Sequence, residues 1–170
     1  MDNEVYALIS EEELYRRTGI QKQIFNSIYQ LMALKKKNPE RLVKAKKLLM
    51  IPDYFHYLLT GVARAEYTNA TTTQLLSPET KDWDRELIKR LGYPSEIFQD
   101  IETAGTLIGH LREDIQKELG YNCKVVLPAT HDTASAVMAV PSMHEEVLYI
   151  SSGTWSLMGT ELMEANCSNE

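Results

Sequence analysis

The chain has 170 residues, of which 44% are hydrophobic, so it is long enough for one domain, or one domain with part of a second, around a buried core. Its net charge of -6 and pI near 5.3 argue against a nucleic-acid partner, because nucleic-acid binding normally requires a basic face. No apolar run reaches membrane-spanning length, and the N-terminus lacks the basic and apolar regions of a signal peptide, which indicates a cytoplasmic protein with no membrane partner. The two cysteines lack metal-ligand spacing, so we expect reduced thiols and no metal site of the chain's own.

The first half of the chain predicts a helical scaffold. Ser10 and Glu13 form a capping-box pattern before a short helix over 11–17, which Gly19 ends. Apolar residues at helical spacing, with Asn, Pro and Gly at the boundaries, predict the later helices. These span 26–37, 39–47, 53–60, 85–91 and 112–119, with Asn26 as the expected cap of the first of them and a short strand within 104–111.

Composition alone characterises three further segments. The helix over 53–60 carries a large apolar load, and we therefore expect it to lie in the core. The polar stretch 68–74, Thr-Asn-Ala-Thr-Thr-Thr-Gln, suits capping and short-range hydrogen bonds to the backbone. The two ends, 1–9 and 163–170, are expected to be the least ordered parts of the chain.

A strand-to-helix junction is the first candidate site. Residues 125–127 predict a short buried strand that Pro128 ends, and small and apolar residues then predict a helix over about 134–140. His131 and Asp132 lie at this junction, where ligands gather in α/β sheets. The positive end of the helix dipole favours an ionised Asp132, and an ionised Asp can take a proton from a hydroxyl group that attacks phosphorus.

Both residues of the junction also have simpler interpretations. Asp is a preferred N-cap residue, so Asp132 could serve only to satisfy the free backbone amides of the helix. His131 could be a structural histidine, a hydrogen-bond donor to a sugar, or a neighbour that tunes Asp132. The residues at the junction leave these alternatives open.

The second candidate site is a turn between two strands. A buried strand is predicted over 147–150 and a returning strand over 155–158, with Ser-Ser-Gly-Thr at 151–154 between them. With Gly153 free to adopt a positive φ, the amides and hydroxyls of this turn can form an anion site for the terminal phosphates of a nucleotide. The alternative is an ordinary hairpin, since the same residues dominate turns for conformational reasons. The proline-led segment 141–146, between the two candidate sites, is the best domain boundary.

Longer motifs extend both sites. They are HDTASAV at 131–137, SSGTWSLMG at 151–159, ELYRRTGIQ at 13–21, PDYFHYLLTG at 52–61 and EYTNATTTQL at 66–75. Together they resemble the FGGY carbohydrate kinase family, and within it the kinases that act on L-rhamnulose. The resemblance extends from about Ser10 to Gly159. It implies an α/β protein of ribonuclease H-like, actin-like ATPase fold.

The resemblance also implies an activity and roles for residues. The activity is ATP-dependent phosphorylation of L-rhamnulose at its 1-hydroxyl, in rhamnose metabolism, with Mg²⁺ accompanying ATP. Asp132 matches the family's proton acceptor, and His131, Asp132 and Thr133 match its sugar-binding residues. Thr154 matches an ATP-binding threonine, with Gly153 supporting it. Fuculose or xylulose as the sugar, and a non-catalytic binding module, remain alternatives.

The same resemblance implies that the chain is an internal piece of a longer kinase with two domains. The family's N-terminal phosphate hairpin and its adenosine-binding segment have no counterpart in this sequence. We therefore expect residues 1–142 to be the later part of the first domain, on the side of the sugar and the base, and residues 143–170 to begin the second domain with its phosphate loop. Such a piece is expected to lack turnover by itself and to be prone to self-association through unpaired sheet edges.

Overall fold

The computed structural model describes residues 1–142, 144, 147–153 and 155–168. Its helices are α1 (Asp2–Tyr6), α2 (Glu11–Thr18), α3 (Ser27–Lys37), α4 (Pro39–Lys44), α5 (Ile51–Thr60), α6 (Tyr67–Thr71), α7 (Arg85–Arg90), α8 (Glu113–Leu119) and α9 (Asp132–Met138), with a short 3₁₀ turn, η1 (Ser95–Ile97). Its strands are β1 (Ala65–Glu66), β2 (Leu76–Ser77), β3 (Asp82–Trp83), β4 (Ile101–Glu102), β5 (Leu107–His110), β6 (Lys124–Val126), β7 (Leu148–Ser152) and β8 (Ser156–Thr160).

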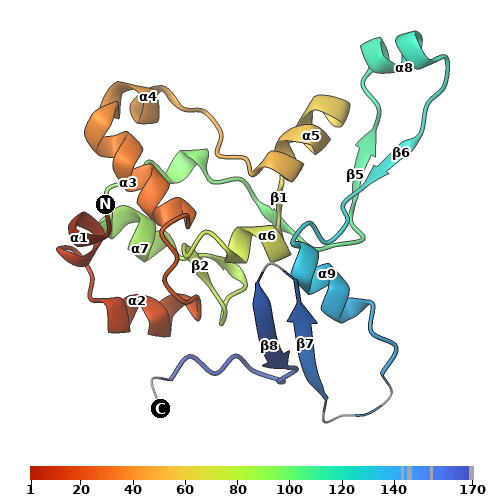
Figure 1. The fold of residues 1–170 in the computed structure, drawn as a ribbon. Coiled ribbons are helices and arrows are strands. Elements are labelled where there is room, and N and C mark those ends of the chain that lie inside the picture. The colour runs from red at the N-terminus through yellow and green to blue at the C-terminus, as the bar shows by residue number, and fades with distance from the viewer. Residues whose placement is uncertain (143, 145–146, 154, 169–170) are drawn as a thin grey trace.

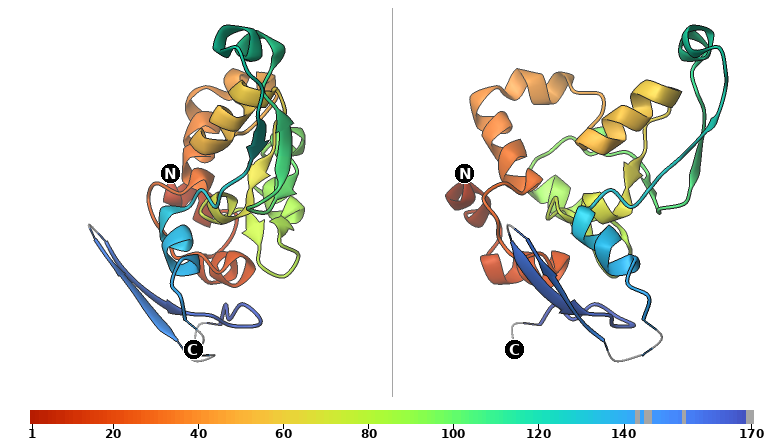
Figure 2. Two further views of the ribbon diagram at one scale, coloured as in Figure 1. Left: turned by 90° about the vertical axis from the view of Figure 1, so that its right-hand side faces the viewer. Right: turned by 45° about the vertical axis from the view of Figure 1, so that its right-hand side comes forward.

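The elements form a helical body from which two hairpins project. Helices α1 to α4 and α7 gather at one end, and α5 and α6 lie beside them (Figure 1). The β5–β6 hairpin carries α8 at its far tip, away from those helices (Figures 1 and 2). The β7–β8 hairpin follows α9 and stands out from the body in the turned views (Figure 2). This arrangement brings α6 and α9 together in the middle of the molecule.

The strands of the described residues pair two by two. β1 runs parallel to β4, with Ala65 opposite Ile101 and Glu66 opposite Glu102. The pairs β2–β3, β5–β6 and β7–β8 are antiparallel. The strand that leads to the first candidate site, β6, therefore belongs to an antiparallel hairpin. Mixed helices and short strands agree with the expected α/β class.

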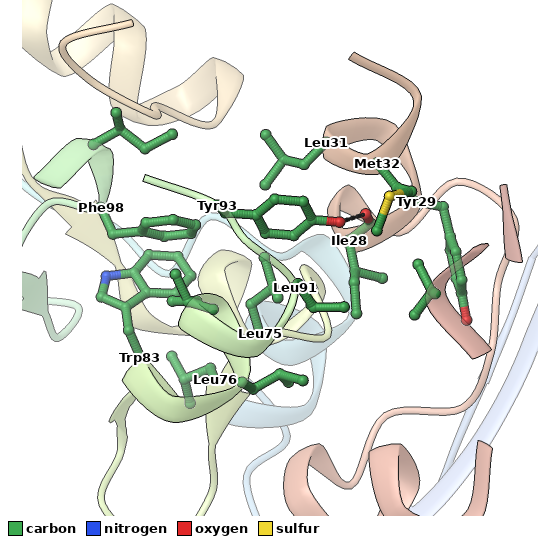
Figure 3. Packing of buried hydrophobic residues seen from close by; sticks show 14 of the residues in the cluster. Ile28, Tyr29, Leu31, Met32, Leu75, Leu76, Trp83, Leu91, Tyr93 and Phe98 are labelled. Carbon is green, nitrogen blue, oxygen red and sulfur yellow. Dashed lines mark hydrogen bonds between the residues drawn. The ribbon is translucent and has the colours of Figure 1, made fainter. Parts of the chain in front are cut away.

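One hydrophobic core joins the N-terminal helices to α7 and the segment that follows it (Figure 3). The ring of Trp83 packs edge-on against Phe98, with the ring centroids 5.0 Å apart. Tyr93 donates its hydroxyl to the carbonyl of Ile28 at 2.7 Å, and Trp83 donates its indole N–H to the carbonyl of Gln99 at 2.6 Å. The buried aromatic side chains thus fill the core while their polar atoms stay satisfied.

Most predicted helix boundaries are confirmed, but one cap is not. Ser10 Oγ accepts from the backbone N–H of Glu13 at 3.1 Å, and Gly19 ends α2 in the left-handed conformation with φ 65°. Asn26 precedes α3, yet its side chain makes no capping bond. Its amide nitrogen instead donates to the carbonyl of Thr72 at 2.7 Å. Its side-chain oxygen, the atom that would accept a capping bond, accepts from the backbone N–H of Gln23 at 2.7 Å. The bond to Thr72 ties the loop before α3 to the end of α6.

Two predictions, the end of the helix at 39–47 and the disorder of residues 1–9, need correction. The predicted third helix ends at Lys44 rather than near Lys47. The N-terminal segment is part of the core, because residues 2–6 form α1 and the side chains of Val5 and Ile9 are buried. Local composition does not predict the burial of Val5 and Ile9, because their neighbours are mostly polar and their burial depends on helices distant in sequence.

Two apolar surfaces predicted as buried are exposed in the described part of the chain. Phe55 on α5 is 59% exposed and Tyr54 is exposed too, so α5 is not a core helix and its buried residue is Asp53. Leu148 and Ile150 on β7 are likewise exposed. Apolar side chains of this kind are normally covered, and these two faces have no covering element among the described residues.

Asp84 offers a test of the contacts that hold α2 against α7. Its buried carboxylate caps α7 by accepting from the N–H of Leu87 at 2.9 Å, and it also binds the guanidinium of Arg17 through two bonds of 2.7 and 2.8 Å. We expect Asp84→Ala to lower the free energy of unfolding by roughly 2–3 kcal/mol, because a cap and a bidentate ion pair are both lost. Urea denaturation measures the change.

The matched control for Asp84→Ala is Asp100→Ala, since the side chain of Asp100 is 79% exposed. We expect this control to change the free energy of unfolding by less than about 0.5 kcal/mol. Equal effects of the two substitutions would show that Asp84 does not hold the two helices together.

Candidate active site

The first candidate site is a turn between β6 and α9. Val125 and Leu127 are buried and anchor the strand side of the turn, as predicted. The turn itself is residues 129–131, and α9 begins at Asp132, two residues before the predicted start. Ser135 fixes the far side, because its hydroxyl donates to the carbonyl of Ala129 at 2.6 Å. The strand–turn–helix junction expected from the sequence is therefore present.

His131, and not Asp132, caps α9. The Nδ1 atom of His131 accepts from the backbone N–H of Ala134 at 3.2 Å. Asp132 is the first residue of the helix and is exposed. Among the described residues, its Oδ1 accepts only from Thr133, from the N–H at 2.7 Å and, more weakly, from the hydroxyl at 3.4 Å. Asp132 is therefore not the N-cap residue of α9, although its carboxylate satisfies the free amide of Thr133 in the first turn.

The second candidate site is the turn between β7 and β8. Ser152 pairs with Ser156 across the hairpin, and their hydroxyl oxygens are 3.3 Å apart. Gly153 does not adopt the positive φ that the sequence suggested, and its N–H donates to the carbonyl of Trp155 at 2.9 Å. That amide is therefore engaged within the turn. Thr154, the predicted ATP-binding residue, lies outside the described residues.

Both turns face one cleft of about 580 Å³. His131, Asp132 and Thr133 line one wall, and Ser151, Ser152, Gly153 and Trp155 line another. The two candidate segments therefore line the same cleft.

A third wall of the cleft comes from the loop before α3, which the sequence reasoning did not assign. Gln21, Gln23, Phe25 and Asn26 line it. Amide side chains beside an exposed aromatic ring can hold a polar, hydroxylated ligand that also has an apolar part. In the sequence, only the motif at 13–21, which ends at Gln21, indicates that this loop is near the site. Loop residues that face a cleft have no hydrophobic periodicity that would predict their position.

A buried carboxylate lies directly beneath the first turn. Glu66, at the end of β1, is fully buried. Its Oε2 accepts from the N–H and the hydroxyl of Thr130, at 3.0 and 2.8 Å, from the hydroxyl of Thr68 at 2.5 Å and from the N–H of Asn69 at 3.2 Å. Burial would raise the pKa of Glu66, but the hydrogen bonds from Thr68 and Thr130 outweigh it and hold the pKa below its ordinary value.

A second buried carboxyl group supports Glu66 from the side of α5. Asp53 is 1% exposed, and its Oδ1 accepts from the backbone N–H of Glu66 at 3.1 Å. Its Oδ2 has no hydrogen-bond partner among the described residues. Burial raises the pKa of Asp53 to about 6, with the nearby charge of Glu66 acting in the same direction. Burial also lowers the pKa of His56 on the same helix.

Two features are absent from the described residues. These residues contain no group of three or more His, Cys, Asp or Glu side chains that could hold a metal ion. None of their helices is both long enough and apolar enough to cross a membrane. Asp132 is thus the one carboxylate among the residues that line the described cleft.

Comparison with known proteins assigns the chain to a family. The profile described as "FGGY family of carbohydrate kinases, N-terminal domain" matches residues 3–139. The chain therefore belongs to the FGGY family of carbohydrate kinases. The rhamnulokinase of Oceanobacillus iheyensis is 56% identical over 161 residues, which are 95% of this chain and 34% of that protein. The rhamnulokinase of Halalkalibacterium halodurans is 53% identical over 93% of this chain and 34% of its own length.

Solved structures show the same fold. A carbohydrate kinase from Novosphingobium aromaticivorans aligns with a TM-score of 0.73 at 26% identity, covering 93% of this chain and 36% of that one. A ligand-bound xylulose kinase from Lactobacillus acidophilus aligns with a TM-score of 0.66 at 28% identity, over 75% of this chain and 28% of that one. The fold is thus a part of the actin-like ATPase fold of FGGY sugar kinases. The chain spans about a third of the length of the curated relatives it matches.

The buried Asp53 predicts a pH dependence of stability. Its folded-state pKa of about 6 lies above the ordinary value of 3.8, so the folded protein binds this proton more tightly than the unfolded one. The stabilisation is complete below about pH 4 and is lost as the pH rises through about 6, a change of about 3 kcal/mol. Urea denaturation of the wild type and of Asp53→Asn between pH 4 and pH 7 measures it.

We expect Asp53→Asn to remove this part of the pH dependence, because an amide does not titrate. The exposed Asp100→Asn is the control and should leave the wild-type slope unchanged. If wild type and Asp53→Asn had parallel profiles over this range, Asp53 would not be protonated in the folded state.

Proposed function

We propose that the full-length protein carrying this chain is a cytoplasmic, ATP-dependent kinase that phosphorylates the 1-hydroxyl of L-rhamnulose. The observation that carries this proposal is the exposed carboxylate of Asp132 in a cleft whose opposite wall is the Ser151–Gly153 turn. The 56% identity to a rhamnulokinase supports L-rhamnulose as the sugar. The chain supplies one part of the catalytic machinery in this proposal.

In the proposed reaction Asp132 is the general base. Its second oxygen, Oδ2, has no hydrogen bond among the described residues, so a lone pair is free to accept the proton of the sugar hydroxyl. His131 and Thr133, on either side, line the same wall and bind the sugar. Phosphoryl transfer depends mainly on positioning and on charge stabilisation, so one well-placed base is sufficient on the sugar side.

The residues present fit the nucleotide less completely than the sugar. Ser151 and Ser152 line the cleft, but the hydroxyl of Ser152 pairs with that of Ser156, and the amide of Gly153 is engaged within its own turn. ATP, accompanied by Mg²⁺, supplies the phosphoryl group when bound. We propose that Gly153 and Thr154 contribute to its site and that most nucleotide contacts come from parts of the relatives that this chain does not match.

We propose a domain boundary close to residue 142. Residues 1–142 then belong to the first domain, on the side of the sugar and the base, and residues 143–170 begin the second with the phosphate turn. The family match over residues 3–139 supports this division. The exposed apolar side chains of α5 and β7 support the expected tendency of the isolated chain to self-associate.

Two alternatives remain for the test. The structural likeness to a xylulose kinase favours xylulose as the second candidate sugar, ahead of fuculose. The other alternative is that the protein is a binding module without catalytic activity and binds its ligand in the same cleft. Turnover assays with the three ketoses separate the sugars, and absence of any turnover in a full-length protein supports the binding module.

Substitution of Asp132 tests the catalytic assignment. The protein for this test is a hybrid kinase, in which this chain replaces the matching part of the 56% identical rhamnulokinase. We expect Asp132→Asn to lower kcat by about 10²–10⁴-fold, because the amide cannot accept the proton, while sugar binding measured by calorimetry stays within a few-fold of wild type. Stability should change little, since His131 caps the helix.

The control for Asp132→Asn is Asp114→Asn, whose side chain is 63% exposed and outside the cleft. We expect this variant to retain wild-type kcat. A hybrid kinase whose turnover survived Asp132→Asn, or one with no turnover at all, would overturn the proposed function.

The 170-residue chain by itself is expected to have no kinase turnover. It matches only 34% of the length of its rhamnulokinase relatives, so in the proposed reaction the nucleotide lacks most of its contacts. A sugar-dependent assay for ADP release, with the hybrid kinase as positive control, measures this. Clear sugar-dependent ADP release by the chain alone would contradict the expectation.

A further inference from the structure

The buried carboxylate of Glu66 is satisfied by hydrogen bonds from uncharged groups. It accepts five hydrogen bonds, three from the Thr68–Asn69 segment and two from Thr130. No salt bridge to it is found among the described residues, although it is fully buried. A buried carboxylate is normally retained only when such bonds satisfy it. The position of these donors around Glu66 therefore matters for the fold of the site.

The partners of Glu66 lead directly to the proposed base. Thr130 contributes both its N–H and its hydroxyl to Glu66 Oε2. The hydroxyl of Thr68 donates to the same oxygen and, through its own lone pair, accepts from the N–H of His131 at 3.2 Å. The two residues immediately before Asp132 are thus both tied to Glu66, one directly and one through Thr68.

We propose that Glu66 is a positioning residue, whose carboxylate holds the Thr130–His131 turn against α6 and thereby sets the place of the Asp132 carboxylate in the cleft. This inference rests on the proposed function for the identity of the base. It adds a residue that touches neither substrate nor nucleotide and that acts through the backbone of the turn.

The bond geometry explains why a carboxylate is needed at this position. Glu66 receives only donors: three backbone N–H groups and two hydroxyls. An ionised carboxylate offers two accepting oxygens and no donor, whereas a Gln side chain offers one acceptor and places two N–H groups against other donors. Charge-assisted bonds are also the stronger ones. The hydrogen bonds that lower the pKa of Glu66 agree with an ionised carboxylate in the folded protein.

The first experiment measures the turn itself, in the 170-residue chain and without any activity. Thr68→Val keeps the shape of the side chain and removes the link to His131, and amide hydrogen exchange reports the effect. We expect exchange at the N–H of His131 to accelerate by roughly five-fold or more, since one net hydrogen bond is lost. The matched control is Thr71→Val, because the Thr71 hydroxyl donates only within α6, to the carbonyl of Thr68.

The second experiment uses the hybrid kinase. We expect Glu66→Gln to lower kcat at least ten-fold with the KM for ATP unchanged, and Glu66→Asp, which keeps the charge, to recover part of the loss. Thr68→Val should lower kcat by a smaller factor and Thr71→Val should not. A purely structural role would lower the urea midpoint and leave the kcat of the folded enzyme unchanged.

The outcomes separate this inference from the proposed function. Unchanged exchange at His131 in Thr68→Val, or a wild-type kcat in folded Glu66→Gln, would overturn the positioning role whatever Asp132→Asn does. Turnover that survives Asp132→Asn would instead overturn the base assignment, and faster exchange at His131 would still show that the turn depends on the Glu66 network.

Discussion

The buried carboxylate of Glu66 is the constraint on which the candidate site depends. A buried ionised group is costly unless its hydrogen-bonding capacity is filled, and the donors that fill it come from segments 64 residues apart in sequence. Neither α6 nor the Thr130 turn alone satisfies it. The group is fully satisfied only when the two segments lie together, which ties the turn before α9 to α6.

Much of the fold can be predicted because its signals are local. Ser10 and Gly19 lie within a few residues of the helix ends that they define, so a reading of neighbours suffices to place α2. The polar stretch at 68–74 also behaves as predicted, since Thr71, Thr72 and Thr73 each donate a hydroxyl to a carbonyl three residues back. The strand-to-helix junction before α9 is likewise predicted by neighbouring residues, from the apolar run at 125–127 and from Pro128.

What could not be predicted depends on partners distant in the chain. Asn26 has the sequence of a cap, but its oxygen accepts from Gln23 and its amide nitrogen donates to the distant carbonyl of Thr72. The apolar faces of α5 and β7 predict burial, yet whether they are covered depends on elements that local patterns do not reveal. Glu66 begins the motif at 66–75, but local patterns do not predict its role, because its partner Thr130 follows only at the turn before α9, 64 residues later.

The two walls of the cleft differ in how they are held, and this difference bears on the chemistry. The wall of Asp132 is held by hydrogen bonds that Thr130 donates to the buried Glu66 carboxylate, and His131 caps the helix, so that Oδ2 of Asp132 is left for other use. The wall of the Ser151–Gly153 turn belongs to a hairpin whose apolar side chains, Leu148 and Ile150, are exposed. Phosphoryl transfer requires the attacking oxygen and the phosphate to be in line. In the proposed enzyme the base is therefore placed by the chain's own hydrogen bonds, whereas the phosphate turn acquires its position from whatever covers the apolar faces of the hairpin.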